Sequence, residues 1–90
     1  MTRHISILIS GKVQGVFFRA SAKEKADELG IYGFVRNQPD GQVYIEAEGD
    51  QERLNLFEMW CKQGPRRADV RHTKVEEGSL KHFFDFSILR

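Results

Sequence analysis

Hydrophobic and polar residues alternate at the start of the chain, which is the pattern of a β-strand with one buried face. Ile5, Ile7 and Ile9 share one side of this segment. Four later segments alternate in a similar way or are rich in β-branched and aromatic residues, which favour strands. The expected strands cover residues 4–10, 33–37, 43–48, 68–77 and 84–89, of which 68–77 has the weakest alternation.

Two further segments repeat their hydrophobic residues every three or four positions, which is the pattern of an amphipathic helix. The first carries Phe18, Ala22, Ala26 and Leu29 on one side and ends near Gly30. The second follows a residue type that caps helices and ends before a Gly-Pro pair. Its expected N-cap is Asp50, its hydrophobic side carries Leu54, Phe57 and Cys61 with Trp60 nearby, and it ends at Gly64-Pro65.

The resulting order of elements is β-α-β-β-α-β with an extra strand. A turn at residues 38–41 joins the second and third strands into a hairpin. Two helices on one face of a mainly antiparallel sheet are the economical packing for this order. We therefore expect an α/β (α+β) fold, a ferredoxin-like α/β sandwich with an extra C-terminal strand, formed by residues 1–90 as a single domain.

Composition excludes several classes of function. The formal net charge is +1, so no strong global field attracts nucleic acid or anionic lipid. No apolar run is long enough to span a bilayer, and no signal peptide is visible after Met1, so we expect a cytoplasmic protein. We also expect a monomer. Cys61 is the only cysteine, which excludes an internal disulfide and favours a buried hydrophobe over a reactive thiol.

The segment Gly11–Arg19, between the first strand and the first helix, is the first candidate site. Its two glycines, four residues apart, let successive N–H groups point into one concavity, and the start of the helix adds unpaired donors. Arg19 adds a planar fork of donors that matches phosphate or carboxylate oxygens. The spacing is not that of a nucleotide P-loop. A tight turn without a ligand is the alternative that the spacing leaves open.

Asn37, at the end of the second expected strand, is the second candidate. In this topology the first loop and the second strand can approach each other at one end of the sheet. An amide can orient a water molecule, although it cannot deprotonate one. The alternative is an ordinary turn asparagine before Pro39-Asp40-Gly41.

Both candidate segments resemble signatures of the acylphosphatase family. Residues 11–19 resemble G-x-V-Q-G-V-x-[FY]-R, and residues 33–43 resemble G-[FWY]-[AV]-x-N-x-x-x-G-x-V. The likeness extends through Trp60, Gly64-Pro65, Ala68-Asp69-Val70 and Phe86-Ser87-Ile88, so it covers nearly the whole chain. The sequence departs from the pattern at Gln38, where many relatives carry a hydroxyl residue or leucine, and in the basic pair Arg66-Arg67.

The resemblance implies an enzyme that hydrolyses acyl phosphates, a class of small-molecule substrate, to a carboxylate and inorganic phosphate. It implies that Arg19 binds the phosphoryl group and that Asn37 positions the attacking water. The backbone N–H groups that would cradle the phosphoryl oxygens belong to Gln14, Gly15, Val16, Phe17, Phe18 and Arg19. No metal, cofactor or covalent intermediate is implied. Because the carboxylate leaving group has a conjugate acid with a pKa of about 4, no general acid is needed.

Two other classes of function share some of these sequence features. The same order of elements builds RNA-recognition domains, but their aromatic pattern is missing here and Tyr44 lies beside Glu46 and Glu48. We therefore expect no nucleic-acid partner, and no membrane partner. A non-catalytic sensor of a phosphorylated metabolite would need the loop and Arg19, but it would not need Asn37.

The remaining polar residues predict no second site. The histidines form no metal-ligand pattern and are expected at strand ends or on the surface. They are His4, His72 and His82. A solvated loop and strand edge explains the basic residues Arg66, Arg67 and Arg71 better than a polyanion site does. The last strand could bring Arg90 and its carboxylate near the candidate site.

Overall fold

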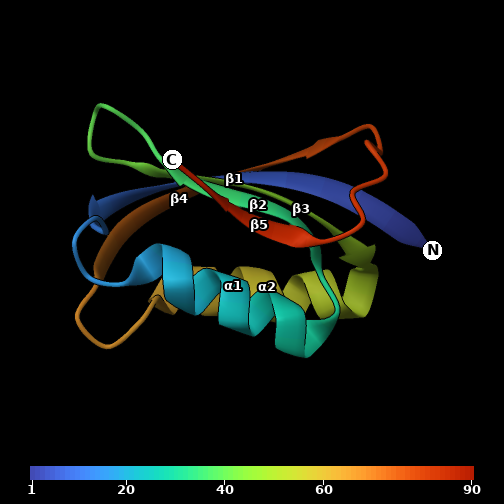
Figure 1. Cartoon of the computed structure of the whole chain (residues 1–90), viewed down its shortest axis with the longest axis horizontal. Coiled ribbons are helices and arrows are strands. Elements are labelled where there is room, and N and C mark those ends of the chain that lie inside the picture. Colours follow the sequence, from blue (N-terminus) through green and yellow to red (C-terminus); the bar gives the residue numbers. More distant parts are fainter.

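The computed structural model describes residues 1–90 as five strands and two helices. In chain order they are β1 (Thr2–Lys12), α1 (Phe18–Leu29), β2 (Tyr32–Asn37), β3 (Val43–Asp50), α2 (Gln51–Gln63), β4 (Asp69–Gly78) and β5 (Phe86–Leu89). The sheet has the order β4-β1-β3-β2-β5. Only the β2–β5 pair is parallel. Both helices cover one face of this sheet (Figure 1), so the expected ferredoxin-like sandwich is confirmed.

The hydrophobic sides of both helices pack against this face of the sheet and form one core. Its fully buried members include Ile7 and Ile9 from β1, Val35 from β2, Val43 and Ile45 from β3, Ala22 and Ala26 from α1, and Phe57 and Cys61 from α2. Burial of Cys61 raises the pKa of its thiol well above the ordinary value. The prediction that this cysteine is a buried hydrophobe is therefore confirmed.

The predicted helix ends are confirmed. Helix α1 stops at Gly30, whose φ of 69° is left-handed and is readily adopted by glycine. Helix α2 begins after Asp50, whose side chain accepts a hydrogen bond of 2.9 Å from the N–H of Arg53. This bond pairs one of the N–H groups that the first turn of a helix leaves free.

The last strand is shorter than expected. It begins at Phe86, and Phe84, which was expected inside it, is 88% exposed. Because β4 and β5 lie at opposite edges of the sheet, residues 79–85 must cross from one edge to the other. They cross on the face that the helices leave open, and the N–H groups of Lys81 and Phe83 donate to Glu48 at 2.6 and 3.1 Å. Ladder pairing with β2 therefore starts only at Phe86.

His4 is buried, so the expectation of a surface or strand-end residue was wrong for this histidine. Its Nδ1 lies 2.8 Å from Glu48 Oε2 and its Nε2 lies 3.3 Å from Glu46 Oε1. The connection 79–85 covers these side chains: the Phe83 ring stacks on His4 and the Lys81 ammonium contacts Glu46 at 2.8 Å. We call His4, Glu46, Glu48 and Lys81 the outer-face cluster. His72 and His82 are exposed, as expected.

Candidate active site

The loop from β1 to α1 has an unusual backbone. Gly15 has a φ of 74°, and a Cβ added there would meet no atom within 4 Å, so the conformation, and not the space, calls for glycine. Phe17 has a φ of 64° and a 69% exposed side chain. A left-handed aromatic residue is strained, and such strain concentrates at functional sites.

This loop presents several backbone donors that the protein leaves free. The N–H groups of residues 14–17 donate no backbone hydrogen bond. Helix α1 has no side-chain cap at Phe17 and no acidic residue in its first turn. The positive end of the helix dipole therefore lies beside a set of available N–H groups, which is an arrangement that binds anions.

The loop forms one wall of a pocket at the end of the sheet. Figure 1 shows the loop after β1, the turn between β2 and β3, and the C-terminal end of the chain at the same end of the molecule. The pocket has a volume of about 410 Å³. Its lining consists of Val13, Gly15, Phe17, Phe18, Arg19, Ala20, Asn37, Ile88 and Arg90. Arg19 and Asn37, which are 18 positions apart in the printed sequence, thus line one cavity.

Arg19 lies in the first turn of α1, and its side chain reaches β5. Nη1 donates a long hydrogen bond of 3.4 Å to the carbonyl of Leu89. Lys23, one turn later, donates at 2.9 Å to the carbonyl of Phe86 and lies 3.1 Å from Asp27. The bonds to Leu89 and Phe86 tie α1 to β5. The sequence pattern places Lys23 on the solvent side of the helix and does not predict its bond to Phe86.

Gln14 has a structural role that the sequence did not reveal. Its Nε2 donates to the carbonyls of Gln38 and Gln42 at 2.8 and 2.9 Å. The N–H of Gln38 also donates to the carbonyl of Gln42 at 2.7 Å, which closes the turn. Gln14 therefore holds the loop against the residue that follows Asn37. Since Gln38 contributes its backbone, the unusual side chain at this position leaves the contact intact.

The other predicted residues are distributed as follows. Of the six proposed cradle residues, Gly15, Phe17, Phe18 and Arg19 line the pocket, whereas Val16 is buried and the Gln14 amide points to the turn. The basic residues Arg66, Arg67 and Arg71 lie outside it, and Arg71 pairs with Asp69 at 3.2 Å. Arg90 lines it.

Comparison with known proteins decides between the classes of function left open by the sequence. Residues 5–88 match the protein-family model described as acylphosphatase. The chain belongs to the acylphosphatase family. It is 45% identical over 89 residues to the acylphosphatase of Methylococcus capsulatus, covering 98% of this chain and 97% of the relative. It is 49% identical over 81 residues to the acylphosphatase of Marinobacter nauticus, covering 89% and 88%.

A solved structure supports the same assignment. The acylphosphatase of Bacillus subtilis superimposes with a TM-score of 0.95 at 36% identity, covering 100% of both chains. The predicted family, the acylphosphatase activity and the hydrolase class are therefore confirmed. In this acylphosphatase, neither helix combines the length and the hydrophobicity needed to cross a membrane.

Proposed function

We propose that Arg19 and the backbone N–H groups of residues 14–19 bind the phosphoryl group of an acyl phosphate, and that Asn37 orients the water that attacks phosphorus. The observation that supports this most directly is the pocket in which the loop, Arg19 and Asn37 meet. Gln14 fixes the loop to the turn beside Asn37. Donors held in place before the substrate binds stabilise developing charge without reorganisation.

The proposed reaction is a direct displacement at phosphorus. The water oxygen bonds to phosphorus as the bond between phosphorus and the acyl oxygen breaks, and the carboxylate leaves with the bonding electrons. Inorganic phosphate keeps the water oxygen with one proton, and the second proton passes to a phosphoryl oxygen. A carboxylate leaving group with a conjugate-acid pKa of about 4 needs no proton. The pocket lining accordingly includes no carboxylate side chain and no imidazole.

The proposal extends to the setting of the reaction. The enzyme acts as a cytoplasmic monomer on a small acyl phosphate, without metal, cofactor, nucleic acid or membrane. The near-balanced charge of +1 supports the absence of a nucleic-acid or membrane partner, because a strong positive field favours binding of a polyanion or an anionic membrane. The molar mass measured by light scattering on the protein eluted from a size-exclusion column tests the monomeric state, and a stable dimer would contradict it.

Hydrolysis of benzoyl phosphate in the presence of a chelator tests the reaction. We expect phosphate release far above the spontaneous rate, unchanged by the chelator. Loss of activity that an added divalent metal restores would contradict the metal-free mechanism. Phosphate binding without turnover would instead indicate a sensor.

Two variants separate the proposed roles. Arg19→Gln should lose phosphate affinity as well as turnover, because it removes the charged donors. In Asn37→Ala, kcat should fall by a factor of about 10²–10³, the typical effect of removing one positioned donor, while the affinity for phosphate is largely kept. The matched controls are Arg66→Gln and Asn55→Ala, two exposed positions outside the pocket, which should keep both properties. Equal losses of phosphate affinity in Arg19→Gln and Asn37→Ala would contradict the assigned roles.

A further inference from the structure

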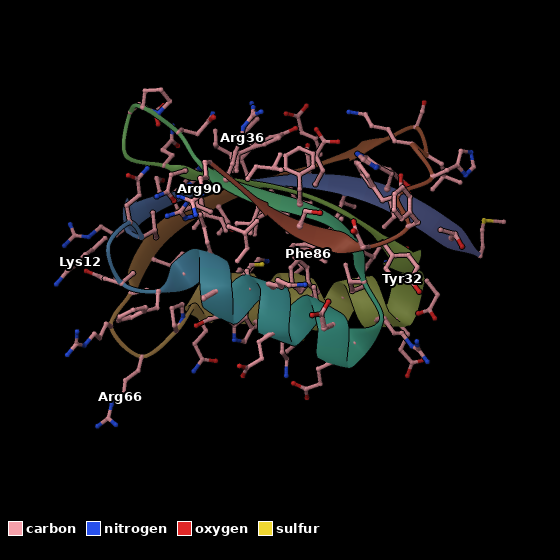
Figure 2. The ribbon with its side chains drawn as sticks, in the orientation of Figure 1. Lys12, Tyr32, Arg36, Arg66, Phe86 and Arg90 are labelled. Atoms are coloured by element: carbon pink, nitrogen blue, oxygen red, sulfur yellow. The ribbon has the colours of Figure 1, made fainter.

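The pocket contains a second guanidinium that the proposed reaction does not use. Arg90 follows β5 and lines the same cavity as Arg19. Figure 2 shows Arg90 near the loop that precedes α1, whereas Arg66 projects away from the body of the molecule. Arg19 and the loop N–H groups already offer enough donors for three phosphoryl oxygens, so the positive charge of Arg90 is in excess of what that group requires.

No acidic side chain in the pocket neutralises this excess charge. The lining includes two arginines and no aspartate or glutamate. Elsewhere on the surface, Arg3, Arg53 and Arg71 each pair with a carboxylate, from Glu77, Asp50 and Asp69 respectively. Two guanidinium groups in a concave site that has no acidic side chain attract anions more strongly than either would alone.

The pocket has room for more than a phosphoryl group. Its volume of about 410 Å³ lies in the range of sites that hold whole small molecules. Phe17 and Ile88 supply apolar walls, and both side chains are partly open to solvent, at 69% and 40% exposure. An acyl group attached to the phosphoryl group would therefore lie along these walls, within the same cavity as Arg90.

The strand that leads to Arg90 is held by contacts with α1 and β2. The carbonyl of Leu89 accepts the hydrogen bond from Arg19, and Leu89 pairs with Arg36 in the ladder between β2 and β5. Lys23 holds the start of β5 through the carbonyl of Phe86. Arg19, on α1, and the strand that precedes Arg90 are thus tied together beside one pocket.

We propose that Arg90 determines specificity by binding a second anionic group, a carboxylate or a phosphate, on the acyl part of the substrate. The enzyme then favours acyl phosphates that carry such a group over those with a neutral acyl part. This inference rests on the proposed placement of the phosphoryl group at Arg19. Arg90 contacts the part of the substrate that does not react, so it is a binding residue and takes no part in the displacement.

The test compares acyl phosphates that differ in one remote charge. The neutral substrate is benzoyl phosphate, and the charged ones are 4-carboxybenzoyl phosphate and 4-phosphonobenzoyl phosphate, whose para groups cannot reach the acyl carbon. The measured quantity is kcat/KM for each charged substrate divided by kcat/KM for benzoyl phosphate. We expect Arg90→Gln to lower this ratio about tenfold for at least one charged substrate, as the loss of a charge-assisted pair implies. The substrate affected shows whether a carboxylate or a phosphate is recognised.

Two further variants exclude a general effect of charge. Arg66→Gln makes the same change in net charge at an exposed position outside the pocket and should leave the ratio unchanged. Arg90→Lys should restore part of the ratio, because the charge returns without the planar fork. An unchanged ratio in Arg90→Gln for both charged substrates, or an equal fall in Arg66→Gln, would overturn the proposal. Failure of Arg19→Gln to impair benzoyl phosphate hydrolysis would instead contradict the proposed phosphoryl site, so the two failures are distinguishable.

Discussion

Removal of the Gln14 amide should detach the phosphate loop from Asn37. Gln14→Met keeps a side chain of similar length but removes both hydrogen bonds, of 2.8 and 2.9 Å, to the turn carbonyls. Each neutral hydrogen bond contributes about 1 kcal/mol net to stability, so the free energy of unfolding of the variant should fall by about 2 kcal/mol. A domain of this size has a free energy of unfolding of about 5–13 kcal/mol, so the variant should still fold.

The loss of about 2 kcal/mol also sets an upper bound on the kinetic effect. If all of the lost free energy had positioned the loop, kcat/KM would fall by at most about 30-fold, because 1.4 kcal/mol corresponds to a factor of ten. Arg19 and the loop N–H groups stay together in the variant, whereas their distance to Asn37 is no longer fixed. We therefore expect kcat for benzoyl phosphate to fall more than the affinity for inorganic phosphate. Urea unfolding, steady-state kinetics and phosphate titration measure the three quantities.

Gln42→Ala is the matched control for Gln14→Met. The Gln42 side chain contacts Asp40 at 2.8 Å, and its carbonyl, which receives the Gln14 bond, is unaffected by the substitution. We expect the free energy of unfolding of the control to stay within about 0.5 kcal/mol of the wild-type value, as is usual for exposed substitutions. We expect its kcat to stay within about twofold of the wild-type value. If Gln14→Met stays within the same limits, or if Gln42→Ala loses as much activity, the positioning role of Gln14 is refuted.

Three further predictions concern the frame around the pocket. In urea unfolding, Gly33→Ala should destabilise more than Gly15→Ala, because a Cβ at Gly33 would overlap the β3 backbone whereas a Cβ at Gly15 has open space. In the same assay, Lys23→Met should lower the free energy of unfolding by about 1 kcal/mol, because its bond to a β5 carbonyl is lost. Lys25→Met loses only an ion pair within α1 and should lower the free energy of unfolding less. Glu48→Gln should make stability less dependent on pH under acidic conditions, as measured by unfolding at several pH values.

Local sequence patterns predicted most of the fold. The period of α1, the Asp50 cap of α2 and the turn at residues 38–41 are each set by residues within a few positions of one another. The loop was also visible as a candidate, because Gly15 and Arg19 stand out at the junction of a strand and a helix. The meeting of this loop with Asn37 was expected from topology, and the pocket contains both.

The features that the sequence did not predict depend on contacts between distant segments. Alternation shows that His4 and Glu48 lie on the side of the sheet opposite Ile7, but it does not show whether that side is covered. Residues 79–85 cover that side, and they lie 33 to 35 positions later in the sequence than the carboxylates that they contact. The Gln14 amide similarly finds its acceptors 24 and 28 positions away. No local pattern encodes such pairings.

The outer-face cluster makes the acid stability of this acylphosphatase depend on Glu48. Burial alone would raise the pKa of Glu48, but the N–H groups of Lys81 and Phe83 and the His4 ring outweigh it and hold the pKa below the ordinary value. Between that lowered pKa and the ordinary value of 4.5, the unfolded chain binds more protons than the folded one. The stability contributed by Glu48 is therefore complete above about pH 5 and is lost as the pH falls through the folded pKa, at up to about 1.4 kcal/mol per pH unit. Glu48→Gln does not titrate, so its free energy of unfolding should fall less than that of the wild type between about pH 6 and pH 3. Equal falls in the two proteins would show that the bonds from residues 79–85 do not lower the pKa of Glu48.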